Sequence, residues 1–266
     1  MTCPPDAVSP PPSHRSLIRD QFTRQAELFA RAPALHDKGA LDALVQAARP
    51  TPGDASLDVA CGPGTVVAAF AGEVRHATGL DATEAMLDQA RELAASRGLA
   101  NVDWRQGDVY ALPFDDGGFD IVSCRFAFHH FETPERAFAE MARVCKSGGR
   151  LVLCDAVASD DPEKAAAFNA MERYRDPSTA AFRDLAYLAR LFAAASLPEP
   201  AMSFYQVPVE LNALLKLSFP VAEDHDGLRA MIVDAIDGDK MGVNARRDGG
   251  RVRFEYAAAI LAAVKP

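Results

Sequence analysis

The sequence of 266 residues lacks any run of 18 consecutive apolar residues, the length that a helix needs to cross a membrane. Its first residues also lack the apolar stretch that a secretory signal requires. We therefore expect a cytoplasmic protein with no membrane partner.

Cysteine pairs at metal-binding spacings are also missing. The five cysteines are Cys3, Cys61, Cys124, Cys145 and Cys154. They form no C-x-x-C motif and no spacing shared with histidine, so the sequence predicts neither a bound metal nor a disulfide framework. Reduced and mostly buried thiols are the expected state in the cytosol.

Basic residues are scarce relative to acidic ones. The net charge is −9, and residues 51–158 hold 16 acidic against 9 basic side chains. A nucleic-acid partner requires a basic face to neutralise phosphates, so this composition argues against RNA or DNA binding. The sequence leaves the oligomeric state open.

Composition and spacing divide the chain into four parts. Residues 1–15 contain five prolines and predict a disordered tail. Residues 16–50 have a helical pattern interrupted by Pro33, which predicts separate helices and, in our interpretation, a lid. Residues 51–158 alternate strands with helices. Residues 159–266 are expected to supply helical insertions and the last strands, and with them an acceptor pocket.

The strand–helix alternation predicts the fold class. Strands are expected near 57–60, 74–81, 102–106, 119–124, 150–157, 201–207 and 251–264. Strands and helices alternating at this spacing are typical of a doubly wound α/β fold with a mostly parallel sheet. We expect seven strands, the C-terminal one reversed, with helical insertions after the fifth and sixth strands.

A glycine turn follows the first strand in Leu57-Asp58-Val59-Ala60-Cys61-Gly62-Pro63-Gly64-Thr65. This strand–turn–helix layout is typical of a nucleotide site. A dinucleotide site uses a third glycine, and Val67 stands at that position. Acids also follow the next strands, at Asp81 and Asp108. Ligands of open α/β sheets bind outside these strand ends, so the acids are expected to share one site.

In these motifs the sequence resembles class I S-adenosylmethionine-dependent methyltransferases, and among them the small-molecule branch that includes ubiquinone and menaquinone biosynthesis enzymes. The resemblance rests on LDVACGPGT at 57–65, TGLD ending at Asp81, GDV at 107–109 with the LPF that follows, the FDIVSCR strand, and the glycine turn before the fifth strand. It implies that S-adenosylmethionine is the cofactor. It also implies methyl transfer to O, N or C of a small-molecule acceptor.

By this resemblance, residues at the ends of the first four strands bind the cofactor: Asp58, Ala60, Cys61, Gly62, Gly64, Asp81, Ala82, Met86, Asp108, Val109 and Arg125. Asp81 is expected to accept hydrogen bonds from both ribose hydroxyls. Asp108 is expected to bind the adenine amino group, and Met86 to pack on the ring. Ala60 stands where the family often has glycine.

Two adjacent histidines, His129 and His130, follow the fourth strand. Imidazole titrates near neutral pH, so either histidine is a candidate general base, and we prefer His130. Both are also compatible with a purely structural role, because methyl transfer can proceed by alignment alone. In the later insertions the candidates for acceptor binding are Glu172, Arg175, Asp176 and Tyr205, and the expected apolar roof is Phe168, Met171, Tyr174 and Phe204.

Three alternatives remain open from the sequence. A fold relative could bind S-adenosylmethionine and catalyse a cyclisation or a decarboxylation. A non-enzymatic module could bind the cofactor without turnover. An NAD oxidoreductase is the third, and the missing third glycine argues against it.

Overall fold

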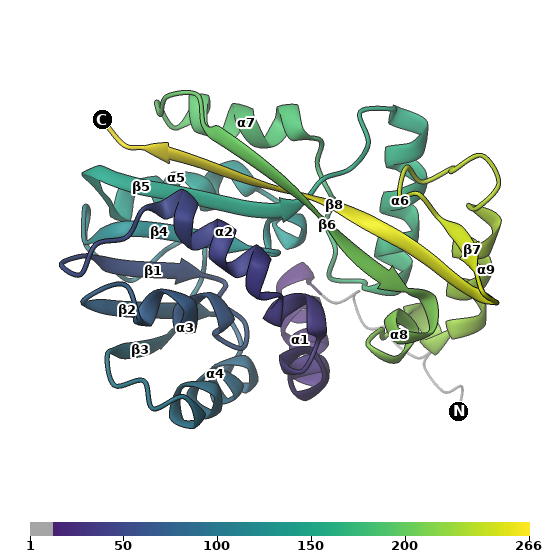
Figure 1. Ribbon diagram of the computed structural model, residues 1–266, viewed down its shortest axis with the longest axis horizontal. Helices are drawn as coiled ribbons and strands as arrows, with labels where there is room; N and C mark the ends of the chain where they lie inside the picture. Colours follow the sequence, from purple (N-terminus) through teal and green to yellow (C-terminus); the bar gives the residue numbers. More distant parts are fainter. Residues whose placement is uncertain (1–12) are drawn as a thin grey trace, which may run out of the picture.

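The computed structural model describes residues 13–266 (Figure 1). Most of the predicted tail, residues 1–12, lies outside this range. The end of the predicted tail is not disordered, because α1 (His14–Ala30) already includes His14 and Arg15 and has Ser13 as N-cap, whose hydroxyl accepts from the Ser16 amide. As Pro33 predicts, α1 is followed by a separate short 3₁₀ helix, η1 (Pro33–His36), and then by α2 (Lys38–Ala48).

A single sheet runs through the molecule in the order β3-β2-β1-β4-β5-β8-β6. The first five strands are parallel: β1 (Ala55–Val59), β2 (His76–Asp81), β3 (Val102–Gln106), β4 (Phe119–Arg125) and β5 (Cys145–Ala156). The long β8 (Arg251–Val264) is antiparallel to β5 and to β6 (Ala201–Glu210). The predicted mostly parallel sheet with a reversed C-terminal strand is confirmed.

An eighth strand was not predicted. The short β7 (Arg246–Asp248) lies off the seven-strand path and forms a hairpin with the start of β8. Its three residues are exposed, so they carry no hydrophobic alternation that would mark a strand in the sequence.

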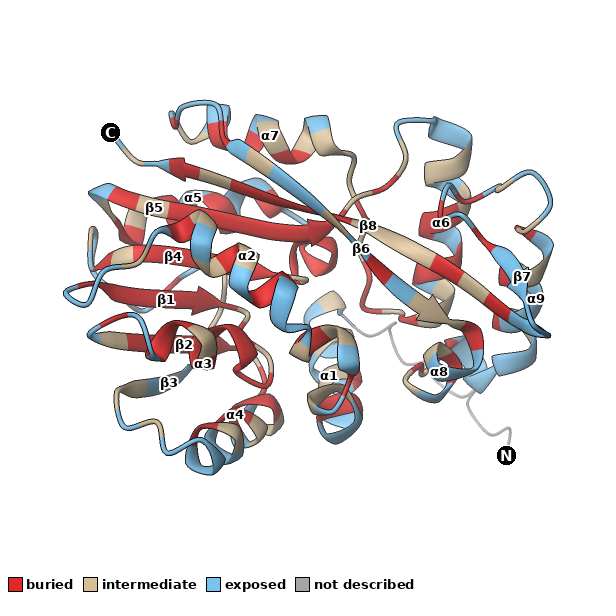
Figure 2. Cartoon of the chain, viewed as in Figure 1, coloured by how far each residue is buried: buried red, intermediate tan, exposed pale blue. Residues whose placement is uncertain are grey.

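Helices cover both faces of the parallel sheet. On one face α2, α3 (Thr65–Ala71) and α4 (Glu84–Ser96) pack against Ile121 and Val152. On the other face α5 (Pro134–Val144) and α7 (Leu185–Ala194) pack against Val122 and Leu151. Neighbouring residues of one strand face opposite layers, which explains why β1, β4 and most of β5 are buried (Figure 2).

The C-terminal strands carry the sheet beyond this core. In Figure 1, β8 and β6 run diagonally from the core to a second group made of α6 (Pro162–Arg175), α8 (Leu211–Lys216), α9 (His225–Asp234) and β7. Val252 and Phe254 at the start of β8 are buried among these helices, whereas Leu261 near its end is buried in the core. The strand therefore ties the two groups together.

Candidate active site

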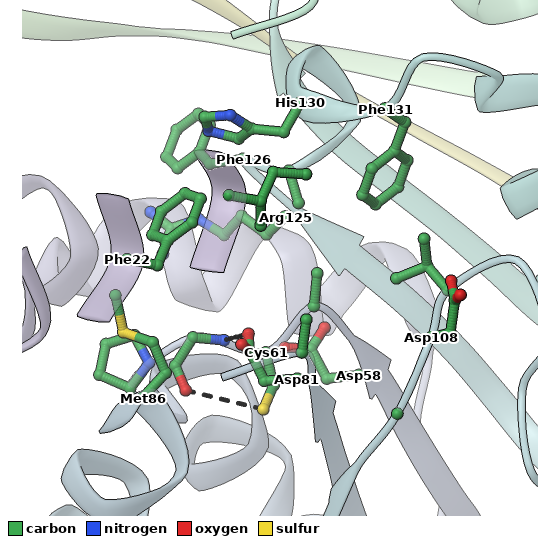
Figure 3. A pocket seen from close by; sticks show the side chains of 18 of the residues that line it. Phe22, Asp58, Cys61, Asp81, Met86, Asp108, Arg125, Phe126, His130 and Phe131 are labelled. Carbon is green, nitrogen blue, oxygen red and sulfur yellow. Dashed lines mark hydrogen bonds between the residues drawn. The ribbon is translucent and has the colours of Figure 1, made fainter. Parts of the chain in front are cut away.

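A first cavity, here called the strand-end cavity, lies at the carboxyl ends of β1, β2 and β4 (Figure 3). Nearly all of the predicted cofactor residues line it: Asp58, Ala60, Cys61, Gly62, Asp81, Ala82, Met86, Asp108, Val109 and Arg125. Figure 3 shows the carboxylates on one side and the rings of Phe22, Phe126, Phe131 and His130 on the other. The strand-end rule thus brings together residues from four separate βα units.

The turn after β1 contains two glycines with different surroundings. Gly62 has φ +51°, and a Cβ built on it would meet nothing within 4 Å. Gly64 has φ +79°, and a Cβ there would lie 2.6 Å from the Trp104 ring. Gly64 does not line the cavity, so it serves packing and turn geometry, while Gly62 keeps the cavity side open.

Ala60 occupies the same turn with φ +55°, a conformation that costs a Cβ-bearing residue energy. Phe126, which also lines the cavity, has φ +54°. Backbone strain of this kind persists where the surrounding structure enforces it, often at functional sites. Both strained residues follow a strand end, on β1 and on β4.

Asp81 lines the strand-end cavity and binds the turn after β1 and the start of α4 through hydrogen bonds. One of its oxygens, Oδ2, accepts from the Gly62 amide at 2.9 Å. The other, Oδ1, accepts from the amide and the hydroxyl of Thr83 at 3.0 and 2.9 Å. Burial raises the pKa of Asp81, and these three hydrogen bonds oppose the rise. Thr83 occupies the N-cap position of α4 but caps no helix amide.

Asp58 lies deeper, at the end of β1, and accepts from the Ser123 hydroxyl at 2.6 Å. Burial raises its pKa to about 7, against the opposing effects of Ser123 and Arg125. A cationic ligand group beside Asp58 would favour its charged form.

The N-terminal helix closes the strand-end cavity. His14, Arg15, Ile18 and Phe22 of α1 line it, and the Arg15 Nη1 lies 3.5 Å from Asp108 Oδ2. Residues 16–50 were expected to form a lid that includes Phe22, but none of these side chains was predicted to bind the cofactor, because a helical pattern does not indicate which loop the helix will cover.

Arg125 fastens the N-terminal segment to β4. Its Nη1 and Nη2 donate to the carbonyls of Leu35 and Ala34 at 3.2 and 3.0 Å. Its Nε is buried and has no hydrogen-bond partner among the described residues. The guanidinium thus supports η1, and its side chain also lines the strand-end cavity.

A second cavity, here called the neighbouring cavity, adjoins the first. It has a volume of about 260 Å³, and the two share the side chains of Phe22, Phe29, Leu35, Phe126 and His130. Most of its remaining wall is apolar, and half of that wall consists of apolar residues in or next to η1, β6 and α8: Ala32, Pro33, Ala34, Val207, Pro208, Val209, Ala213, Leu214 and Leu217. A cavity with mainly apolar walls and a few convergent polar groups is typical of a small-molecule site.

The polar part of the neighbouring cavity contains three predicted acceptor-binding residues, Glu172, Arg175 and Asp176. Glu172 is fully buried; its Oε1 accepts from the Tyr256 hydroxyl at 2.6 Å, and its Oε2 accepts from Arg175 Nε at 2.8 Å. Asp176 accepts from the amide and hydroxyl of Ser178 and, at 3.4 Å, from Gln25 of α1.

The two histidines differ in their hydrogen bonding. The His129 Nδ1 lies 2.8 Å from Asp155 Oδ1, and the His129 amide donates to the other Asp155 oxygen. A carboxylate at Nδ1 holds the proton there and leaves the Nε2 lone pair available. The His129 ring also stacks on Phe182 at 4.1 Å and lines the neighbouring cavity.

His130 lines both cavities but is a poorer base. Burial, together with the adjacent His129, lowers its pKa to about 3. Its Nδ1 lies 3.0 Å from the Ser178 carbonyl oxygen, and Phe22 packs edge-on against its ring. The geometry therefore favours His129 over His130, the reverse of the preference drawn from the sequence.

Tyr205 was expected to bind the acceptor, but it lines neither cavity. Its hydroxyl lies 3.4 Å from the Cys154 Sγ, in the layer that contains α2. Residues two apart on a strand share a face, so Tyr205 lies on the same face of β6 as Val207 and Val209, which line the cavity. Tyr205 is left out of the cavity because it lies nearer the start of the strand, beside the layer that contains α2. The expected roof residues Phe168, Met171, Tyr174 and Phe204 also lie outside both cavities.

Asp155 is the functional candidate that the sequence analysis missed. It lies at the carboxyl end of β5 and is 2% exposed. The rule that singled out Asp58, Asp81 and Asp108 applies to it equally, since it is also an acid at a strand end.

Within residues 13–266, no group of three or more His, Cys, Asp or Glu side chains is placed to hold a metal ion. Over the same residues, no helix has the length and apolarity needed to cross a membrane.

Comparison with known proteins agrees with the geometry of the strand-end cavity. Residues 57–153 match the family model of the methyltransferase domain. The chain is 28% identical over 246 residues to YcgJ of Bacillus subtilis, an uncharacterized methyltransferase; the match covers 92% of this chain and 97% of YcgJ. Its crystal structure superposes with a TM-score of 0.77, covering 85% of this chain and 98% of that one.

Two further relatives extend the comparison. A putative methyltransferase from Bacillus halodurans superposes with a TM-score of 0.79 at 28% identity, covering 86% of this chain and 99% of its own. The ubiquinone/menaquinone biosynthesis C-methyltransferase UbiE of a Ruegeria species is 38% identical over 117 residues, which cover 43% of this chain and 47% of UbiE.

Residues 57–153 therefore form a methyltransferase domain, and the comparisons support a class I S-adenosylmethionine-dependent methyltransferase. The family model spans β1 to β5, the part of the methyltransferase that builds the strand-end cavity. S-adenosylmethionine is its cofactor. The similarity to UbiE covers only about half of UbiE's length.

Proposed function

We propose that this methyltransferase binds S-adenosylmethionine in the strand-end cavity and transfers its methyl group to a small molecule in the neighbouring cavity. The observation that carries the proposal is the shared wall of Phe22, Phe126 and His130, which places the two cavities side by side. The neighbouring cavity is mostly apolar, which suits a partly apolar acceptor. UbiE, a relative, is a C-methyltransferase of ubiquinone and menaquinone biosynthesis, which also supports a small-molecule acceptor.

The cofactor residues act through charge and shape. The open space at Gly62 admits the methionyl part of S-adenosylmethionine. The carboxylate of Asp58 attracts the ammonium group of that part. Asp81 already accepts three hydrogen bonds, and a carboxylate has about four acceptor sites. Both ribose hydroxyls can therefore bind only when the Thr83 hydroxyl turns away. Met86 and Asp108 remain our proposed contacts for adenine.

When bound, S-adenosylmethionine supplies an electrophilic methyl group on a positively charged sulfur. His129 then takes the proton that the acceptor atom loses, through its free Nε2. Asp155 orients the imidazole and stabilises the charge that it gains. At the pKa of about 3 that its burial produces, His130 stays neutral and contributes shape to the wall between the cavities.

Helix α1 serves as the lid over both cavities. It meets the cofactor side through Arg15 and Asp108, and the acceptor side through Gln25 and Asp176. By lying across the junction at Phe22, it excludes water from the reacting atoms. If α1 is such a lid, amide hydrogen exchange over residues 18–29 slows when S-adenosylhomocysteine is added. Equal exchange with and without this ligand contradicts the lid and leaves α1 as a fixed support.

The proposed function is tested by incubating the protein with methyl-labelled S-adenosylmethionine and a metabolite extract. We expect label in a small product, formed together with an equal amount of S-adenosylhomocysteine. Product that forms without consumption of the cofactor would favour cyclisation or decarboxylation. Label on protein or RNA alone would show that the acceptor class is wrong.

A further inference from the structure

We propose that Arg175 selects acceptors that carry a carboxylate on an apolar body; the inference rests on the proposed function of the neighbouring cavity. Arg175 lies at the last residue of α6, its side chain is 15% exposed, and it lines that cavity. No role in binding a particular chemical group follows from the family model, which ends at residue 153.

The carboxylates in the wall of the neighbouring cavity already have hydrogen-bond donors. Both oxygens of Glu172 are bound, one by Tyr256 and one by Arg175. Both oxygens of Asp176 accept, from Ser178 and Gln25. Glu210 accepts from the first amides of α8. Most acceptor sites of these acids are therefore occupied, so they offer few further hydrogen bonds to a ligand, although they keep their negative charge.

Arg175 has unused donors instead. Its Nε and Nη2 lie 2.8 Å from one oxygen of Glu172, which occupies one edge of the guanidinium. Its Nη1 donates to none of the residues that the structure describes. The end edge, formed by Nη1 and the second hydrogen of Nη2, is thus available. That edge matches the two oxygens of a carboxylate and can bind them both.

The surroundings specify the rest of the ligand. Val207, Val209, Leu214 and Leu217 line the same cavity from β6 and α8, and none of them offers a polar side chain. The Arg175 side chain is itself largely shielded from water, and a charge-assisted hydrogen bond to such a group is stronger than one at an exposed surface. The cavity is therefore complementary to an organic acid with an apolar chain or ring.

The test compares three probes that share a chain and differ in the head group: octanoate, octan-1-ol and octylamine. Each is titrated by calorimetry into full-length protein saturated with S-adenosylhomocysteine, whose own binding is measured first. We expect octanoate to bind about tenfold to a hundredfold more tightly than octan-1-ol. Octylamine is expected to bind most weakly.

The variant pairs Arg175→Gln with Glu172→Gln, so that no buried carboxylate is left without its partner. We expect this double variant to bind octanoate and octan-1-ol equally, with S-adenosylhomocysteine affinity unchanged. Arg173→Gln is the matched control, since Arg173 is exposed on the same helix and outside the cavity; it is expected to keep the preference. Arg175→Lys keeps the positive charge but loses the planar guanidinium that can bind both carboxylate oxygens. We expect it to reduce the preference for octanoate over octan-1-ol partially.

The outcomes separate this inference from the proposed function. If octan-1-ol binds and octanoate binds no better, the carboxylate inference is wrong, while the apolar acceptor cavity stands. Tightest binding of octylamine also overturns the inference, because the acids would then dominate recognition. If none of the probes binds to protein that binds S-adenosylhomocysteine, both the inference and the acceptor cavity are wrong.

Discussion

The two cavities of this methyltransferase are built in different ways. The strand-end cavity takes its carboxylates from the ends of successive parallel strands, Asp58, Asp81 and Asp108, within about fifty residues of chain. The neighbouring cavity is assembled from α1, η1, η2 (Phe128–His130), α6, β6, α8 and β8, which span most of the sequence. The proposed cofactor site thus follows from a local repeating pattern, whereas the proposed acceptor site depends on how distant segments meet.

This contrast predicts that the two functions separate under mutation. Changes at the strand ends should alter cofactor affinity, and changes at the polar part of the neighbouring cavity should alter turnover. Five residues line both cavities, so the separation should fail at these positions: Phe22, Phe29, Leu35, Phe126 and His130.

The largest effect is expected at the histidine pair. His129→Ala should lower turnover by about 10²–10⁴-fold with S-adenosylhomocysteine affinity unchanged, because it removes the proposed base but no cofactor contact. Asp155→Asn should act in the same direction, by disturbing the imidazole's orientation. Steady-state rates and calorimetry measure the two properties. Turnover within a few-fold of wild type in His129→Ala would leave alignment alone as the mechanism.

On the cofactor side, Asp81→Ala should weaken S-adenosylhomocysteine binding by at least about 10²-fold, since each charge-assisted hydrogen bond contributes roughly 1.5–3 kcal/mol. The variant should also melt at a lower temperature, because the Gly62 and Thr83 amides lose their acceptor. Asp103→Ala, an exposed acid on β3, is the control and should bind normally. Unchanged affinity in folded Asp81→Ala protein contradicts the assignment.

A pH titration sharpens the role of Asp58. With a pKa raised to about 7, its carboxyl is protonated in the free protein at lower pH, and an ammonium group requires it charged. S-adenosylhomocysteine affinity should therefore fall by about tenfold per pH unit below 7 and level off above it. Asp58→Asn should flatten the profile.

Asp58 should also make the free energy of unfolding of the ligand-free protein depend on pH. This free energy should fall as the pH rises, whereas S-adenosylhomocysteine affinity should increase. Folding raises the pKa from 3.8 to about 7, so the folded state holds a proton that the unfolded chain loses. This carboxyl therefore lowers the free energy of unfolding progressively as the pH rises from 3.8 to about 7. A variant profile that parallels wild type in both binding and stability would show that Asp58 is not the titrating group.

The smallest effect concerns the strained turn. Ala60→Gly should raise the free energy of unfolding by up to about 1 kcal/mol, because glycine adopts φ +55° without the Cβ penalty. Ala69→Gly in α3 is the matched control and should lower it by about the same amount, because glycine is unfavourable within a helix. Thermal unfolding of both variants gives the comparison. A destabilised Ala60→Gly protein would mean that the Ala60 methyl contributes packing worth more than the strain.

The sequence by itself determined the parallel core and the location of the proposed cofactor site. Short, nearly continuous apolar strands, glycine turns and strand-end acids are local patterns, and a parallel sheet brings all carboxyl strand ends to one edge. Asp155 could have been predicted by the same reasoning as Asp58, Asp81 and Asp108. The exposed β7 could not, because it carries no alternation of apolar and polar residues.

Only the tertiary structure decided the acceptor side. The choice of His129 over His130 depends on a hydrogen bond to Asp155, 26 residues away in the chain, which no local pattern indicates. Likewise Val207 lines the neighbouring cavity and Tyr205 does not, although both lie on one face of β6, because the packing of distant segments decides how far along the strand the cavity extends. Contacts between distant segments depend on how helices and strands pack, and packing is a property of the whole folded chain.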